Sequence, residues 1–102
     1  MTVAELKAKL DEGEKPFVLD VREADELAHA AYPFPVVHIP MGEMQARVGD
    51  LPRTGAIVCA CRSGARSASV AGFLRRQGYD AVNLEGGILA WAREVGLGTP
   101  QY

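Results

Sequence analysis

The residues from Cys61 to Ser67 form the part of this chain best suited to chemistry. An apolar run, Ala56 to Ala60, leads directly into Cys61, and a run with helical spacing begins at Ser67. This order predicts a strand, a tight loop and a helix, so that N–H groups of the loop and the positive end of the helix converge on one point. A cysteine placed there is stabilised as a thiolate, which is its nucleophilic form. We therefore predict that Cys61 is a catalytic nucleophile.

Small and basic residues follow the cysteine in the predicted loop. Ser63, Gly64 and Ala65 are small enough for the backbone to approach a bound anion closely. Arg62 and Arg66 bracket them, and guanidinium groups suit oxyanions because they offer two parallel hydrogen bonds. We expect the backbone of these five residues to form an anion cradle and the two arginines to orient an anionic substrate.

Several residues of this region also have a structural interpretation. Arg62 and Arg66 could be ordinary surface charges, and Arg66 could instead bind carbonyl groups of the loop. Ser67 stands at the start of the predicted helix, where we expect it to support the site by capping free N–H groups. Cys59 is interpreted as a small core residue, and its alternative role is a second thiol that takes part in the chemistry.

Short apolar segments alternate with helical segments along the chain. The predicted strands are Phe17 to Val21, Val36 to Ile39, Ala56 to Ala60 and Ala81 to Leu84. The predicted helices are Val3 to Gly13, Glu23 to Ala30, Met41 to Val48, Ser67 to Gln77 and a last helix after Gly86-Gly87 that contains Trp91. This pattern favours the α/β class, with three layers: a central parallel sheet flanked by helices on both faces.

In such a fold the site lies beyond the carboxyl ends of the strands. The segments at these ends are Asp20-Val21-Arg22, His38-Ile39-Pro40, the loop that begins at Cys61, and Glu85-Gly86-Gly87. Asp20, Arg22 and Glu85 are expected to support the site, because a carboxylate and an arginine at neighbouring strand ends can pair and fix the loops. His38 is interpreted as structural, since a thiolate nucleophile needs no general base.

Composition limits what the whole chain can be. Its 102 residues predict a single domain over residues 1–102, with an extended tail over residues 96–102. The chain is 48% apolar and 24% charged with a net charge of −2, so neither nucleic acid nor a membrane is expected as a partner. No apolar run has the length of a membrane span, and residues 1–6 lack the pattern of a signal peptide, so we expect a cytoplasmic protein.

The two cysteines, Cys59 and Cys61, are too few for a disulfide framework. Residues two apart in a strand have Cα atoms about 6.5 Å apart, near the limit for a disulfide, so we expect both thiols to be reduced. His29 and His38 have no zinc-type spacing to the cysteines. We expect neither a metal nor an organic cofactor.

Four segments of the chain resemble, in order, the motifs of the single-domain rhodanese family. They are Leu19-Asp20-Val21-Arg22-Glu23, His38-Ile39-Pro40, Cys61-Arg62-Ser63-Gly64-Ala65-Arg66-Ser67 and Asn83-Leu84-Glu85-Gly86-Gly87-Ile88-Leu89-Ala90-Trp91. The third segment looks like the active-site loop of that family. The resemblance extends from Val3 to Trp91, nearly the whole chain.

The resemblance implies a rhodanese-like fold and sulfurtransferase activity. Cys61 would take the outer sulfur of thiosulfate or of a persulfide donor, carry it as a persulfide, and pass it to a thiol or to cyanide. Arg62 and Arg66 would bind the sulfonate end of the donor, and Ser63 would donate a hydrogen bond to the persulfide. A relay in which the donor or acceptor is a protein shares this chemistry and differs only in its partner.

Two alternatives remain from the residues themselves. Cysteine-dependent phosphatases and arsenate reductases use Cys-x5-Arg, whereas four residues separate Cys61 from Arg66, and the smaller cradle suits a sulfur atom better than a phosphoryl group. Neither Asp50 nor Asp80 stands where a general acid is expected. The other alternative is a binding module that has the fold without the activity, and the intact cysteine counts against it.

Overall fold

Four parallel strands form one sheet, in the spatial order β2–β1–β3–β4. The strands are β1 (Phe17–Asp20), β2 (Val37–His38), β3 (Ile57–Ala60) and β4 (Ala81–Asn83). The helices are α1 (Val3–Asp11), α2 (Ala24–His29), α3 (Met44–Arg47), α4 (Ala65–Arg76) and α5 (Gly87–Glu94), with the short 3₁₀ helices η1 (Met41–Glu43) and η2 (Val48–Asp50). The computed structural model describes residues 1–96, so the predicted tail, apart from Gly96, lies outside the described residues.

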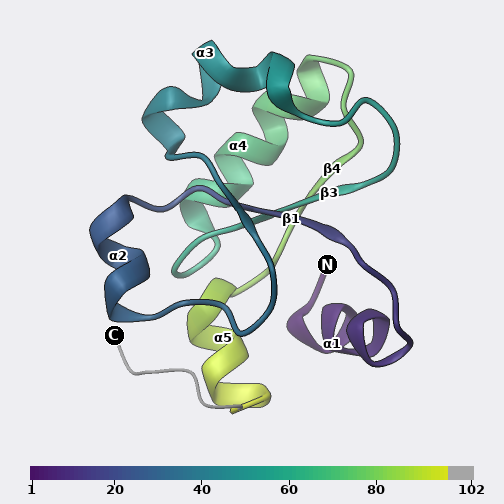
Figure 1. Ribbon diagram of the computed structural model, residues 1–102, viewed down its shortest axis with the longest axis vertical. Helices are drawn as coiled ribbons and strands as arrows, with labels where there is room; N and C mark the ends of the chain where they lie inside the picture. Colours follow the sequence, from purple (N-terminus) through teal and green to yellow (C-terminus); the bar gives the residue numbers. More distant parts are fainter. Residues whose placement is uncertain (97–102) are drawn as a thin grey trace.

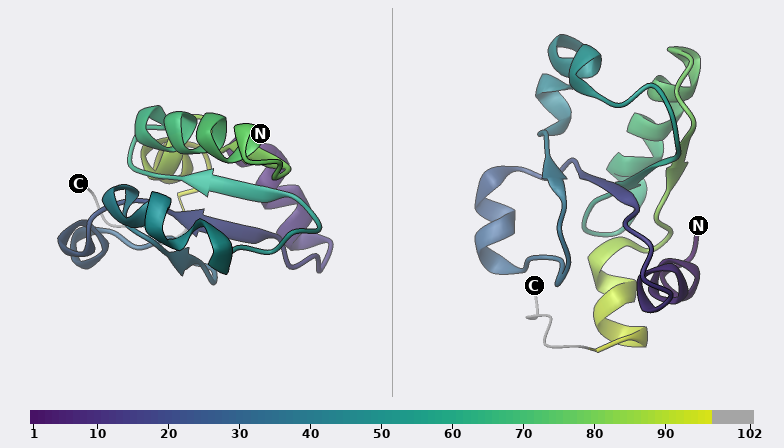
Figure 2. Two further views of the ribbon diagram at one scale, coloured as in Figure 1. Left: turned by 90° about the horizontal axis from the view of Figure 1, so that it is seen from above. Right: turned by 45° about the vertical axis from the view of Figure 1, so that its right-hand side comes forward.

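Helices cover both faces of the sheet. Side chains alternate between the faces along each strand, so Leu19 and Cys59 pack with α4 on one face while Val18 and Val58 pack with α1 and α5 on the other. In Figure 1, α3 and α4 lie above the strands and α1 and α5 lie below them, and the right-hand view in Figure 2 shows the same two layers. The prediction of an α/β fold with a central parallel sheet between helices is confirmed.

The start of α4 corrects one prediction. The helix begins at Ala65, two residues before the predicted start. Gly64 occupies the N-cap position with φ of +98°, a left-handed conformation that glycine adopts without a steric penalty. Because this turn lets the helix begin directly after the loop, Ser67 lies within the first turn. Its predicted role as the helix cap is therefore wrong.

The predicted helix over residues 41–48 is divided into three pieces. Two 3₁₀ turns, η1 and η2, flank a single turn of α-helix, α3. Gly42 and Gly49 lie within these turns, and glycine disfavours a continuous helix because it loses the most conformational freedom on ordering. The segment therefore follows the sheet surface as short turns instead of one helix.

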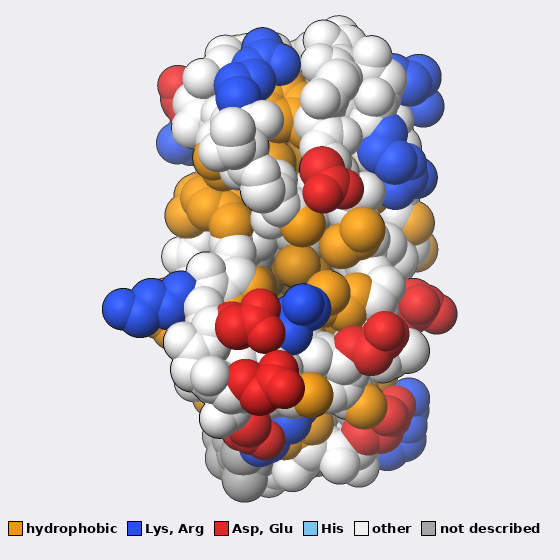
Figure 3. Space-filling view, turned by 90° about the vertical axis from the view of Figure 1, so that its right-hand side faces the viewer, with side chains coloured by type: hydrophobic (Ala, Val, Ile, Leu, Met, Phe, Trp, Pro, Cys, Tyr) orange, Lys and Arg blue, Asp and Glu red, His pale blue; other side chains and the backbone are white. Residues whose placement is uncertain are grey.

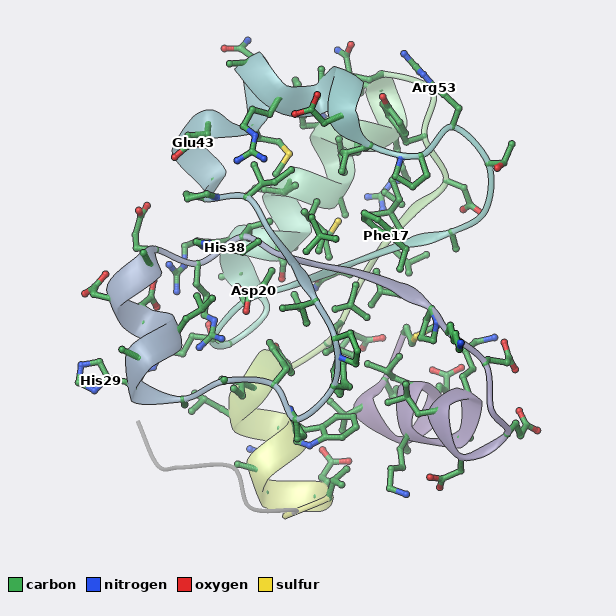
Figure 4. The ribbon with its side chains drawn as sticks, in the orientation of Figure 1. Phe17, Asp20, His29, His38, Glu43 and Arg53 are labelled. Atoms are coloured by element: carbon green, nitrogen blue, oxygen red, sulfur yellow. The ribbon has the colours of Figure 1, made fainter. Side chains whose placement is uncertain are left out.

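A buried ion pair lies at the carboxyl edge of the sheet. The Arg22 Nη2 atom donates to Asp20 Oδ2 at 2.8 Å and Nε donates to Oδ1 at 3.0 Å, and neither side chain is exposed. The guanidinium also donates to the Ala30 carbonyl at 2.7 Å, which fixes the end of α2. The Arg22 carbonyl lies 2.6 Å from His38 Nε2, and Figure 4 shows Asp20 and His38 together at this edge. The predicted pairing of a carboxylate with an arginine is thus present.

Glu85, which we expect to support the site from a neighbouring strand end, makes its contacts away from Asp20 and Arg22. Its carboxylate is 68% exposed and stands 3.5 Å from the amino group of Met1. Its backbone N–H donates to the Met1 carbonyl at 2.9 Å. The described contacts therefore join Glu85 to the first residue of the chain rather than to Arg22.

The surface carries charges of both signs. On the face shown in Figure 3, basic and acidic side chains are interspersed, with apolar surface visible between them. The longest helix among residues 1–96 has 12 residues, and none of the described helices could cross a bilayer.

We predict that Asp20→Asn lowers the free energy of unfolding by about 3 kcal/mol, because it leaves the buried Arg22 charge without its counter-ion. The matched control is Asp11→Asn, which removes the same charge from the surface pair with Lys7 and is expected to cost about 0.5 kcal/mol or less. Urea denaturation of both variants measures the difference. Equal losses in the two variants would contradict the structural importance of the buried pair.

Candidate active site

Cys61 follows β3 directly and is 1% exposed. Its carbonyl accepts hydrogen bonds from the Tyr32 hydroxyl at 2.7 Å and from the Ile88 N–H at 3.1 Å. The next carbonyl, that of Arg62, accepts from the Leu89 N–H at 3.1 Å. The first turn of α5 therefore donates to the start of the loop, which satisfies N–H groups that a helix start otherwise leaves free. These contacts turn the carbonyl groups away from the cysteine sulfur.

Gly87 makes the close approach of α5 to the loop possible. A Cβ atom at this position would lie 2.5 Å from the Cys61 carbonyl oxygen and 2.6 Å from that of Arg62. The φ angle of +55° is also one that other residues rarely adopt. A side chain at this position would therefore displace the loop.

The cysteine sulfur lies among hydrogen-bond donors. The Gly64 N–H donates to Cys61 Sγ at 3.1 Å and the Ser67 hydroxyl lies 3.2 Å from it. The backbone N–H groups of Ser63 and Ser67 also stabilise the thiolate. The loop predicted from the sequence thus closes around the sulfur, with Ser67 contributing as a donor from within the first turn of α4.

The pKa of the Cys61 thiol is the result of opposing influences. Burial, the largest, raises the pKa, but the donors from Ser67, Gly64 and Ser63 together bring it below its ordinary value. Cys59, two residues earlier, has burial without such donors, and burial raises its pKa to about 12. Both thiols are free. The two cysteines, one in β3 and one directly after it, therefore differ in reactivity because of what surrounds each sulfur.

Asn83, at the end of β4, connects both sides of the cradle. Its amide nitrogen donates to the Gly64 carbonyl at 3.1 Å, and its Oδ1 atom lies 2.6 Å from the Ser67 hydroxyl oxygen, so Oδ1 and the Cys61 sulfur are alternative acceptors for the one hydroxyl hydrogen. Sequence reasoning did not assign Asn83 a role, although it is the first residue of the segment that resembles the C-terminal rhodanese motif. A polar side chain at the end of an apolar strand was the available signal.

Arg66 and Arg62 lie at the rim of the cradle in different surroundings. The guanidinium of Arg66 forms a two-pronged ion pair with Glu26 on α2, with distances of 2.6 and 2.8 Å. Arg62 is exposed. Ala65 is also exposed and begins α4. Sequence reasoning did not single out Glu26, because nothing in the chain order places it next to a residue 40 positions away.

Tyr32 links the buried ion pair to the loop. The Arg22 guanidinium carbon lies 5.4 Å from the centre of the Tyr32 ring, and the Tyr32 hydroxyl donates to the Cys61 carbonyl. Arg22 thus supports the loop indirectly. Tyr32 lies in an irregular segment between α2 and β2, and its sequence context gave no signal of this role.

The remaining candidate groups do not gather around the sulfur. His38 binds backbone at the strand ends, and Figure 4 shows His29 on the outer side of α2, pointing away from the sheet. Within residues 1–96, no three His, Cys, Asp or Glu side chains lie close enough together to hold a metal ion.

Known proteins are similar to this chain in sequence and in fold. The chain matches the Rhodanese-like domain model over residues 2–94. It is 39% identical to YtwF of Bacillus subtilis over 93% of this chain and 91% of that protein, and 38% identical to a protein of Allochromatium vinosum named sulfurtransferase over 86% and 82%. A rhodanese-like domain protein from Staphylococcus aureus superposes with a TM-score of 0.85 at 34% identity, covering 100% of this chain and 96% of that one. The chain therefore belongs to the family of rhodanese-like domains.

Proposed function

We propose that the protein is a sulfurtransferase that carries sulfane sulfur as a persulfide on Cys61. The observation that carries this proposal is the convergence of N–H and O–H donors on one buried sulfur whose pKa lies below the ordinary value. A lowered pKa increases the fraction of the sulfur that is thiolate, the nucleophilic form of a cysteine, so the reaction needs no side-chain base. Membership of the rhodanese-like family and relatives named sulfurtransferases support the same reaction.

The reaction has two halves. The Cys61 thiolate attacks the outer sulfur of thiosulfate or of a persulfide, the sulfur–sulfur bond of the donor breaks, and sulfite or a thiolate leaves with the electron pair. The outer sulfur atom of the resulting persulfide is anionic and lies in the cradle. A thiol, cyanide or a protein acceptor then removes it, and the Cys61 thiolate is restored.

The substrate-binding roles follow the positions of the side chains. The backbone of Ser63, Gly64 and Ala65 is proposed to surround the transferred sulfur, and the Gly64 N–H already donates to Cys61 Sγ beside it. Arg62, exposed at the rim, is proposed to orient the oxyanion end of the donor. Arg66 is proposed to do so together with Arg62, from the opposite end of the loop.

The two alternative functions make different demands on this site. A phosphatase needs a cradle wide enough for a phosphoryl group, whereas this short loop closes on one sulfur, with the Gly64 N–H 3.1 Å from Cys61 Sγ. A binding module needs no thiolate, so nothing in that alternative accounts for the donors around Cys61. The two free thiols suit the cytoplasm, which we propose as the compartment of the protein.

We predict that wild-type protein incubated with thiosulfate gains about 32 Da, the mass of one sulfur atom, and that cyanide or a thiol removes it. Cys61→Ser is expected to gain nothing, and Cys59→Ala, the matched control, is expected to gain the same mass as wild type. Intact-mass spectrometry measures all three proteins.

Hydrolysis of p-nitrophenyl phosphate serves as the test of the phosphatase alternative. We expect no hydrolysis above that of the Cys61→Ser variant. If the mass of wild type stays unchanged after incubation with thiosulfate and hydrolysis depends on Cys61, the protein is a phosphatase and the proposal of sulfur transfer is wrong.

We predict that Ser67→Ala raises the pKa of Cys61, because the thiolate loses one hydrogen bond to a charged group. Alkylation of Cys61 by iodoacetamide should then slow by up to about tenfold below the pKa and approach the wild-type rate at high pH. The control is Ser69→Ala, an exposed serine of the same helix, which should leave the profile unchanged. Superimposable profiles for wild type and Ser67→Ala would contradict the role of the hydroxyl.

A further inference from the structure

Glu26 on α2 is the residue that holds the rim arginine of the cradle. Both carboxylate oxygens of Glu26 accept from Arg66, at 2.6 and 2.8 Å, and the Glu26 side chain is only 17% exposed. Paired planar groups of this kind form the stronger class of ion pair. In Figure 1, α2 lies beside the loop that joins β3 to α4, which is where this pair forms.

The carboxylate is also fixed from its own side. Its Oε2 atom accepts the N–H of Glu23 at 2.9 Å, in the capping box that begins α2. Glu26 is therefore not a mobile surface group that happens to meet Arg66. The position of its negative charge relative to the loop is set by the start of the helix.

The consequence is a reduced positive charge at the mouth of the site. Arg66 is one of the two arginines that bracket the loop, and Glu26 offsets its charge. Asp25, in the first turn of the same helix, is exposed, so solvent and salt screen its charge. A donor therefore approaches a mouth in which the Glu26 carboxylate stands next to the Arg66 guanidinium.

We propose that Glu26 determines donor specificity by charge, disfavouring dianionic donors such as thiosulfate relative to monoanionic donors such as persulfides and thiosulfonates. This inference rests on the proposed sulfur transfer to Cys61 and assigns it a class of donor. A unit charge several ångströms away, in the partly screened surroundings of a protein surface, changes the binding of one further unit charge by about threefold to tenfold.

Two small donors isolate the effect of charge. Thiosulfate is a dianion, and methanethiosulfonate is a monoanion in which a methyl group replaces one oxygen. In both reactions the Cys61 thiolate forms a bond to the outer sulfur while the donor's sulfur–sulfur bond breaks. The leaving group, sulfite or methanesulfinate, departs with the electron pair, and the Cys61 persulfide carries one negative charge.

The test compares Glu26→Gln with wild type for both donors. Glutamine keeps the size of the side chain and an oxygen that can accept the Glu23 N–H. We expect kcat/KM for thiosulfate to rise about threefold to tenfold relative to kcat/KM for methanethiosulfonate, through a lower KM. Asp25→Asn, which removes the same charge from the same helix, is the matched control and should change this ratio by less than about twofold.

A second measurement tests the effect of the Glu26 charge in a reaction that does not transfer sulfur. Iodoacetate and iodoacetamide alkylate Cys61 through the same displacement and differ by one negative charge. The rate constant for iodoacetate divided by that for iodoacetamide should rise in Glu26→Gln by a factor similar to the rise in the ratio of kcat/KM for the two donors. Circular dichroism tests whether the variant is folded.

The outcomes separate the inference from the function on which it rests. If wild type takes sulfur from either donor but both ratios are unchanged in Glu26→Gln, the charge role of Glu26 is refuted and the sulfurtransferase function remains. A fall in thiosulfate activity alone would also refute it, because Glu26 would then be orienting Arg66 for the dianion. If wild type takes sulfur from neither donor, the proposed function fails and the inference fails with it.

Discussion

The site depends on the direction in which a few peptide groups point. The carbonyls of Cys61 and Arg62 are taken up by Tyr32 and by the first turn of α5, so the N–H groups that follow in the loop are left to face the sulfur. A buried thiolate without such donors would be unstable, because the free energy lost on removing the charge from water would exceed the free energy gained from interactions in the interior. Cys59, two residues earlier, shows the effect of burial without these donors, since burial raises the pKa of its thiol to about 12.

Residues around the loop hold its peptide groups in this orientation. Gly87 allows the helix to come close, Asn83 joins Gly64 to Ser67, and the buried Asp20–Arg22 pair supports Tyr32. Asn83 and Gly87 come from the end of β4 and the segment after it, and Asp20 and Arg22 come from the end of β1 and the segment after it. The reactive group and its supports meet only because parallel strands place all their carboxyl ends along one edge.

The parts of this structure that depend on local order can be predicted from the sequence. The alternation of apolar strands with helices predicts the fold, and the small residues after Cys61 predict the loop. The predicted capping role of Ser67 is wrong, because the capping rule does not show that Gly64 can turn the chain and start the helix two residues earlier. The roles of Asn83, Tyr32 and Glu26 could not be predicted, because they exist only through contacts between distant segments. Such contacts leave no spacing pattern in one chain.

The burial of Cys59 also makes the protein a reporter of its own stability. With its side chain 0% exposed and its pKa raised to about 12, this thiol meets a reagent only when β3 separates from its neighbours. Once Cys61 has been blocked, the rate at which Cys59 is labelled can be divided by the rate in an unfolded chain. This ratio measures the fraction of molecules in which the centre of the sheet is open. The strand that presents the reactive sulfur thus carries, two residues away, a natural probe of local unfolding.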